Sequence, residues 1–145
     1  MTAAVRDSDA SATQRTTLRF VAGMPGLEEY TRYTLVGIVS SPVYWLECDD
    51  EPAIALPVAA AEAISPSYAF ELTTADAIAL GLGGARDALV LVVLTVSRER
   101  GGITANLMAP IVVNRATLAA RQVILDGNRY PLRFPVESFD DAADN

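Results

Sequence analysis

Eight short hydrophobic runs, separated by polar or glycine-containing segments, set the pattern of this chain. They are TLRFVA (17–22), YTLVGIV (33–39), VYWLEC (43–48), AIALPV (53–58), YAFEL (68–72), ALVLVVLTVS (88–97), ITANLMAPIVVN (103–114) and RQVIL (121–125). Short runs at this spacing are typical of strands in small all-β domains. The pattern therefore predicts a mainly β fold, a small antiparallel β-barrel-like domain or sandwich, over residues 17–136.

The two longest runs differ in how their hydrophobic residues alternate. ALVLVVLTVS is apolar on both alternations, which predicts a central strand with both faces covered. ITANLMAPIVVN has one apolar face and one mixed face, because Asn106, Pro110 and Asn114 all fall on the second. Arg100–Gly102 lies between the two runs and predicts a turn that makes them neighbours.

Pro110 is unusual within a run that otherwise reads as a strand. Proline has no backbone N–H, so we expect Pro110 at a sheet edge or a bulge, where pairing is interrupted and another group can approach. Asn106 and Asn114 could orient a ligand, but such residues more often satisfy backbone groups at the end of a strand.

One segment, TTADAIALGLGG (73–84), departs from the β pattern. Thr73 or Thr74 can cap a helix, and Asp76 falls in its first turn, where the helix dipole favours a negative charge. Gly81 supplies a stop. We therefore expect one short helix, from about 75 to 81, packed on the sheet.

The two ends of the chain differ in composition from the part between them. Residues 1–16 are small and polar without periodicity, which predicts a flexible arm, and residues 137–145 carry four carboxylates and predict an acidic tail. Because the arm has no apolar core and no run approaches the ~20 residues of a membrane span, we expect a cytosolic protein.

Composition excludes several kinds of chemistry. The 145 residues include no His and no Lys, so all eleven basic residues are Arg, and a single cysteine, Cys48, cannot form an internal disulfide. Ser-His-Asp and Cys-His catalysis, Schiff bases and the phosphate-loop Lys are excluded, as are the commonest zinc sites. The net charge of −7 argues against direct binding of nucleic acid and suits a basic partner.

The densest polar segment is Glu47–Glu51, directly after Tyr44 and Trp45. It could be a carboxylate site for a metal or for acid–base catalysis, but consecutive strand residues point to opposite faces, so a solvated acidic turn is the simpler interpretation. Cys48 reads as a small buried hydrophobe. For Trp45 core packing is favoured, and an interface anchor with a charged rim is the alternative. We expect no catalytic group, no metal and no cofactor.

Several motifs stand in a particular order along the chain. They are F-x-x-G-x-P-G (20–26), YWLECDDEPAIALPV (44–58), PSY (66–68) before the predicted helix, TANLMAPIVVN (104–114) and RQVIL (121–125). In this order they resemble the flagellar assembly factor family, FliW. The resemblance runs from about Leu18 to Pro135, and TANLMAPIVVN followed by QVIL is its most specific part.

The resemblance implies a small, non-enzymatic, β-barrel-like protein with two partners. Family members bind flagellin in the cytoplasm and also bind the translational repressor CsrA, a basic RNA-binding dimer, so that export of flagellin frees the factor to capture the repressor. A partner segment lying along the sheet at Pro110 is then one explanation of that proline, and a bend that protects a barrel corner is the other. We expect a monomer.

Two segments are the predicted partner-binding surface. Their residues are Tyr44, Trp45, Glu47, Asp49 and Asp50 in the first, and Asn106, Met108 and Pro110 in the second. The chain also departs from the family pattern, since residues 1–16 show no extra first strand, Leu27 stands where Phe is common, and Glu47 stands where Gln is common. A small carboxylate-dependent enzyme and a barrel that binds a small ligand in its mouth are the alternative functions.

Overall fold

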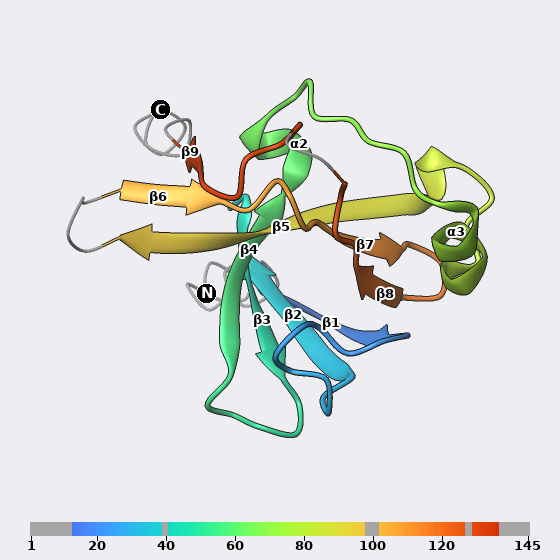
Figure 1. Ribbon diagram of the computed structural model, residues 1–145. Coiled ribbons are helices and arrows are strands. Elements are labelled where there is room, and N and C mark those ends of the chain that lie inside the picture. Colours follow the sequence, from blue (N-terminus) through green and yellow to red (C-terminus); the bar gives the residue numbers. More distant parts are fainter. Residues whose placement is uncertain (1–12, 39–40, 98–101, 127–128, 137–145) are drawn as a thin grey trace, which may run out of the picture.

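β-strands are the main secondary structure of the described chain, as the alternating hydrophobic residues predict (Figure 1). The computed structural model describes residues 13–38, 41–97, 102–126 and 129–136. Within them the strands are β1 (Thr13–Phe20), β2 (Arg32–Ile38), β3 (Val43–Cys48), β4 (Ala55–Ala60), β5 (Ala88–Ser97), β6 (Gly102–Ala105), β7 (Ile111–Asn114), β8 (Ala119–Gln122) and β9 (Phe134–Val136). Two short helices, α2 (Ala61–Ile64) and α3 (Thr74–Leu80), and the 3-10 turn η1 (Ala85–Asp87) connect β4 to β5.

Seven strands of the described chain close into a barrel. Their order is β4-β3-β2-β1-β8-β7-β5, and β5 returns to pair with β4. β6 and β9 extend the sheet beside the far end of β5, on the left in Figure 1. The prediction of a mainly β, barrel-like domain with antiparallel pairing is confirmed, with one exception: β1 and β8 run parallel, and they pair only at Arg19 and Phe20.

β5 holds this arrangement together, as its apolar sequence predicts. Its first four residues pair with β7, Leu91–Val93 pair with β4, and Leu94–Ser97 pair with β6. The two longest hydrophobic runs are therefore neighbours, although residues 98–101 of the predicted turn lie outside the described residues. Both faces of β5 are covered except at its end, where Thr95 and Val96 are exposed.

Large side chains fill the interior of the barrel. Leu18, Phe20, Tyr33, Leu35, Leu46, Cys48, Val58, Leu91, Ile111 and Val113 form this core. Cys48 is only 3% exposed, which confirms its prediction as a small buried hydrophobe. Two further clusters lie outside the barrel, one between β5, β6 and α2 and the other beneath α3.

The run ITANLMAPIVVN is not one strand, and this prediction was wrong. It divides into β6 and β7, because the Asn106 side-chain oxygen accepts hydrogen bonds from the backbone N–H groups of Met108 and Ala109, both at 3.0 Å. These local bonds replace strand pairing. Pro110 is buried, and its carbonyl accepts the N–H of Val123 at 2.8 Å, so the residue does not stand at an exposed edge.

Four further points on the strands need correction. YAFEL (68–72) is a loop, because the Tyr68 hydroxyl donates to the carbonyl of Leu107 and the ring packs beside Phe70, so its apolar residues cover the barrel wall. The strand predicted at RQVIL (121–125) begins and ends earlier in the chain, because β8 covers Ala119–Gln122. The sequence did not predict β9, and β1 begins at Thr13 within the predicted arm. Residues 1–12 of that arm and the predicted acidic tail, 137–145, lie outside the described residues.

The predicted short helix is confirmed as α3. The Thr73 hydroxyl accepts the N–H of Asp76 at 3.1 Å and so caps the first turn. Gly81 ends the helix in the left-handed conformation, with φ 68°, where a residue without a Cβ avoids strain. α3 packs against β8, at the opposite end of the molecule from β9 (Figure 1).

Tyr33 brings a hydroxyl group into the barrel core without a hydrogen-bond partner among the described residues. Burial raises the pKa of Tyr33 from 10.0 to about 12, with a smaller contribution from Cys48. Since the pKa is higher in the folded state, ionisation of Tyr33 opposes folding: stability does not depend on this ionisation below pH 10, and it falls as the pH rises toward 12.

We expect Tyr33→Phe to leave the free energy of unfolding at pH 7 unchanged or to raise it by about 1 kcal/mol, because no hydrogen bond is lost. The loss of stability between pH 10 and 12 should also become smaller. Urea unfolding across this pH range measures both effects. Tyr68→Phe is the control, since it removes the 2.6 Å bond to Leu107 and should cost about 1–2 kcal/mol. A clear loss of stability in Tyr33→Phe at pH 7 would contradict the assignment.

Candidate functional site: an exposed tryptophan among charged residues on β1, β2 and β3

The outer surface of β1, β2 and β3 brings Trp45, Glu47 and Asp49, which the sequence singled out, together with polar residues of β1 and β2. Strand alternation sends Leu18, Leu35 and Leu46 into the core and turns their neighbours outward. The register places Arg15 beside Val36 and Val36 beside Trp45, with Thr17, Thr34 and Glu47 in the next row. The Trp45 face is the name used below for these outward residues: Arg15, Thr17, Thr34, Val36, Trp45, Glu47 and Asp49.

Trp45 is half exposed, at 50% of its surface, so the favoured prediction of core packing was wrong. It lies between Val36 of β2 and Pro57 of β4, both of which are partly buried. A large aromatic side chain that stays accessible beside apolar neighbours is typical of an interface anchor. The structure therefore favours the alternative interpretation of this residue.

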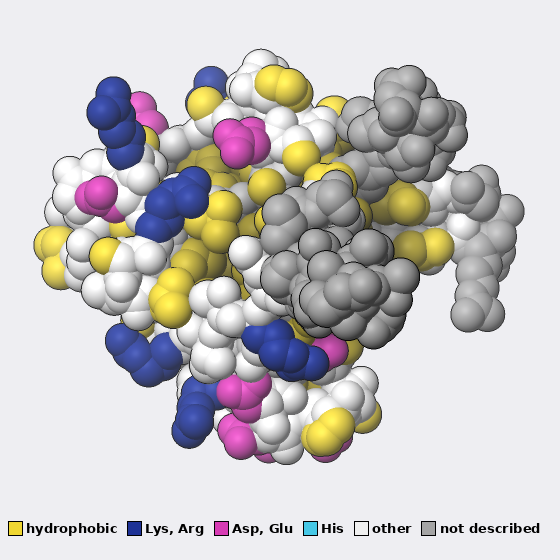
Figure 2. All heavy atoms as spheres, turned by 180° about the vertical axis from the view of Figure 1, so that it is seen from behind, with side chains coloured by type: hydrophobic (Ala, Val, Ile, Leu, Met, Phe, Trp, Pro, Cys, Tyr) yellow, Lys and Arg dark blue, Asp and Glu magenta, His cyan; other side chains and the backbone are white. Residues whose placement is uncertain are grey.

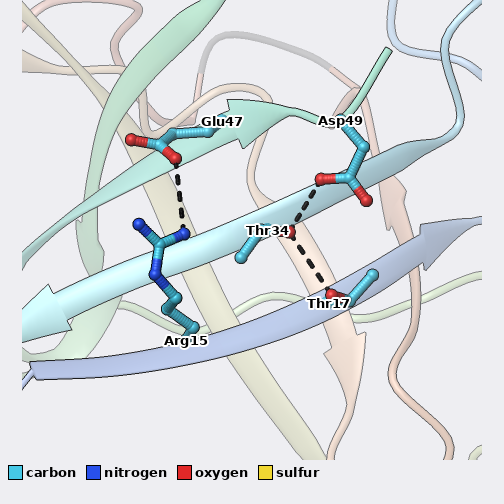
Figure 3. A network of polar contacts seen from close by, with 5 residues as sticks. All are labelled: Arg15, Thr17, Thr34, Glu47 and Asp49. Atoms are coloured by element: carbon cyan, nitrogen blue, oxygen red, sulfur yellow. Dashed lines mark hydrogen bonds and ion pairs between the residues drawn. The ribbon is translucent and has the colours of Figure 1, made fainter. Parts of the chain in front are cut away.

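Three polar contacts link β1, β2 and the end of β3 across the Trp45 face (Figure 3). The Arg15 guanidinium and the Glu47 carboxylate lie 3.8 Å apart. The Thr34 hydroxyl donates to the Asp49 carboxylate at 2.7 Å and lies 3.3 Å from the Thr17 hydroxyl. Because the groups are exposed, water screens the ion pair, which contributes little to stability and can exchange for other partners.

The acidic segment Glu47–Glu51 does not form a convergent carboxylate site. Glu47 faces Arg15, Asp49 faces Thr34, Asp50 is exposed, and the Glu51 carboxylate accepts the N–H of Ala53. No group of three or more Cys, Asp or Glu residues suited to a metal ion occurs in the described parts of the chain. The arrangement agrees with a solvated acidic turn at the end of β3.

Glu28 also differs from what a general acid requires. Its carboxylate accepts the N–H of Gly26 at 3.0 Å, and this bond lowers the pKa of the carboxyl group. A general acid near neutral pH needs a pKa shift in the opposite direction.

Tyr44 belongs to the predicted surface but points into the barrel. Its ring packs at the edge of the core and lies against Gly37, where an added Cβ would come within 2.2 Å of the ring. Gly37 therefore leaves the space that the Tyr44 ring occupies. Alternation along β3 separates Tyr44 from its outward neighbours Trp45 and Glu47.

The second predicted segment lies apart from the Trp45 face. The backbone of residues 106–110 is already paired with residues 122–125: Leu125 donates to Met108, the Gln122 side chain donates to Ala109, and Val123 donates to Pro110. Met108 is partly buried. These bonds cover the edge on which a partner segment was expected to lie.

Sequence reasoning missed Arg15, Thr17 and Thr34. The first two were assigned to the arm and to the start of a strand, although Thr13, Arg15 and Thr17 alternate with the residues that face inward. Asn114, in contrast, behaves as the simpler interpretation expected. It is 4% exposed, and its side chain bonds to the backbone of residues 80, 81, 116 and 117.

A hollow of about 530 Å³ opens outside the barrel wall, beneath the loop that contains Tyr68 and Phe70. Leu72, Leu82, Leu89 and Val112 are among its apolar lining residues, and Glu62 and Arg115 also border it. Figure 2 shows hydrophobic side chains gathered in a hollowed region on the face turned away in Figure 1, with Arg side chains around it.

None of the helices described is long and apolar enough to cross a membrane.

Comparison with known proteins gives a consistent result. The family model described as FliW protein matches residues 4–136. The flagellar assembly factor FliW of Geotalea uraniireducens is 39% identical over 113 residues, which cover 78% of this chain and 69% of that protein. FliW of Bdellovibrio bacteriovorus is 33% identical over 124 residues, or 85% and 71% of the two chains. A crystal structure of the flagellar assembly factor FliW superimposes with a TM-score of 0.76 at 29% identity, covering 82% of this chain and 84% of that one.

Proposed function

The chain belongs to the FliW family of flagellar assembly factors, and we propose that it acts there as a non-catalytic protein with two protein partners. One partner is flagellin, and the other is a CsrA-type translational repressor. While the chain holds flagellin, the repressor is free to silence flagellin mRNA in the cytoplasm. When flagellin is exported, the chain captures the repressor and translation resumes. The two binding equilibria are then linked, and each partner lowers the apparent affinity for the other.

The observation that carries this proposal is the half-exposed Trp45 beside the charged residues of the Trp45 face. Buried aromatic anchors surrounded by a polar rim dominate the affinity of many protein interfaces. Glu47, Asp49 and Asp50 lie along one side of Trp45, and the whole chain has a net charge of −7. Both features favour a basic partner, so we assign the repressor to this side of the Trp45 face.

The two alternative functions have less support. The carboxylates of residues 47–51 point to separate partners, which does not suit a pair that shares one proton or one substrate. The barrel interior is filled by Leu46, Val58, Ile111 and their neighbours, each fully buried, which leaves little room for a ligand in its mouth.

Isothermal titration calorimetry tests the proposal with the purified chain and the flagellin and repressor of the same organism. We expect a 1:1 complex with flagellin, a separate complex with the repressor, and loss of the repressor signal once flagellin is saturating. Repressor titrated into flagellin alone is the control for direct contact between the partners. Independent binding of both partners would contradict the exchange, and binding of neither would overturn the proposed function.

A further inference from the structure

Among the described residues, β1 has one edge that is paired along most of its length and one that is paired only at its end. Toward β2 the pairing is continuous, from Thr13 opposite Ile38 to Arg19 opposite Arg32. Toward β8 it is limited to Arg19 and Phe20. Within the described residues, the first six residues of β1 therefore have no strand beside them on that edge.

The direction of the backbone N–H and C=O groups identifies which residues of β1 have unpaired donors and acceptors on the open edge. Arg19 donates its backbone N–H to the carbonyl of Leu118, and Val21 donates to the carbonyl of Ala120. The backbone N–H and C=O groups of the odd-numbered residues therefore point toward β8. Phe20 donates to Thr31 on the β2 side. Alternation then directs the N–H and C=O groups of Thr13, Arg15 and Thr17 to the open edge.

This edge is accessible and lacks the usual structural protection. Thr13, Arg15 and Thr17 are all exposed, and β1 contains neither a proline nor a residue with positive φ. Native proteins usually cover such an edge or interrupt it, because unpaired strand groups are a template for another strand. An edge on which three alternate residues have unpaired backbone N–H and C=O groups is a site for β-strand addition.

We propose that an extended, acidic segment of a protein partner adds to the open edge of β1, along Thr13–Thr17. The partner is flagellin, and this inference rests on the proposed function. The free groups of Thr13, Arg15 and Thr17 bond to the backbone of the added segment, and the outward Arg15 guanidinium takes a carboxylate from it.

Charge decides between the possible occupants. The outward residues of β1 include Arg15 and Arg19, whereas the acidic segment lies at the end of β3, with β2 between the two strands. A basic repressor suits the acidic segment and is repelled by these arginines. A second copy of the chain is also disfavoured, because the fully overlapping antiparallel register sets one Arg15 opposite the other.

The position of Arg15 also suggests why two partners exclude each other. Its guanidinium lies 3.8 Å from the Glu47 carboxylate (Figure 3). Arg15 also shares a cross-strand row with Val36 and Trp45. A carboxylate from the added segment competes with Glu47 for this cation. The edge of β1 and the repressor side of the Trp45 face are thus neighbouring surfaces that share one ion pair.

Residue-resolved hydrogen exchange by NMR tests the proposal with the full chain, free and saturated with flagellin. We expect the amides of Thr13, Arg15 and Thr17 to exchange rapidly in the free chain and at least tenfold more slowly in the complex, while Thr16 and Leu18 change little. Flagellin binding without this protection would overturn the inference but leave the proposed function. Failure of flagellin to bind would overturn both. Protection in the free chain would mean that another part of the chain occupies the edge, which also overturns the inference.

A charge reversal supplies the second measurement. We expect Arg15→Glu to weaken flagellin binding at least tenfold. Arg86→Glu is the matched control, because it changes the net charge equally at an exposed position on η1. Equal losses in the two variants would indicate long-range attraction only and would contradict a carboxylate seated at Arg15. Circular dichroism confirms that both variants are folded.

Discussion

Replacing Asn114 by Ala is expected to lower the free energy of unfolding by about 3 kcal/mol, since the loss leaves buried backbone groups without partners. The side-chain NH₂ donates to the carbonyls of Leu80 at 2.8 Å and Gly81 at 3.3 Å, where α3 ends. The side-chain oxygen accepts the N–H groups of Ala116 at 2.8 Å and Thr117 at 3.2 Å. One buried side chain therefore fastens a helix end and a turn to β7.

Two further variants separate this role from a general effect of losing an amide. Asn106→Ala removes a partly buried side chain whose oxygen accepts two N–H groups, so the expected loss is smaller, about 1 kcal/mol. Asn114→Asp keeps an acceptor for Ala116 and Thr117 but places a negative charge at the carbonyl end of α3, which should destabilise the fold. Urea unfolding followed by circular dichroism measures all three. Equal stability of Asn114→Ala and the native chain would show that the helix end does not depend on this contact.

The sequence predicted those elements whose causes are local. The apolar run of β5 leaves no polar face, and only a strand covered on both sides accommodates it. The helix α3 has its cap, its first-turn carboxylate and its terminal glycine within nine residues, Thr73–Gly81. Each of these signals acts through neighbours along the chain, so no knowledge of the tertiary structure was required.

The division of ITANLMAPIVVN could not be predicted in this way. Hydrophobic alternation continues through the break because Leu107 packs with the cluster near β6, whereas Ile111 packs in the barrel core. The loop between β6 and β7 is apolar because its Leu107 and Pro110 side chains, like those of the strands, are packed in the interior. The partner of Pro110 is Val123, thirteen residues further on, and that pairing depends on the closed barrel.

The candidate surface was found only in part, because its other half depends on strand register. The sequence pointed to Trp45 and the carboxylates that follow it, all within one segment. Arg15 and Thr34 join them only when β1, β2 and β3 are aligned, which sets Thr17 beside Thr34 and Thr34 beside Glu47. An assignment of residues 1–16 to an arm conceals this register, since it leaves half of β1 out of the sheet.

Trp45→Ala is expected to weaken binding of the CsrA-type repressor by about 2 kcal/mol or more, a factor of about 30, with little change in stability. The ring is half exposed in the free chain, so its removal opens no cavity in the barrel core. In a complex the same ring would be covered, and its loss would remove a large buried apolar area. Calorimetric titration of the repressor into each variant measures the difference.

Val96→Ala is the matched control for this prediction. Val96 is an exposed hydrophobic residue at the end of β5, 63% accessible, and β4 separates β5 from β3. If every exposed apolar side chain contributed to repressor binding in proportion to its size, both variants would lose affinity. We expect Val96→Ala to stay within about threefold of the native chain, because residues outside the centre of an interface contribute little. Native affinity in Trp45→Ala would move the repressor site away from β3, and the acidic segment would then lose its assigned partner.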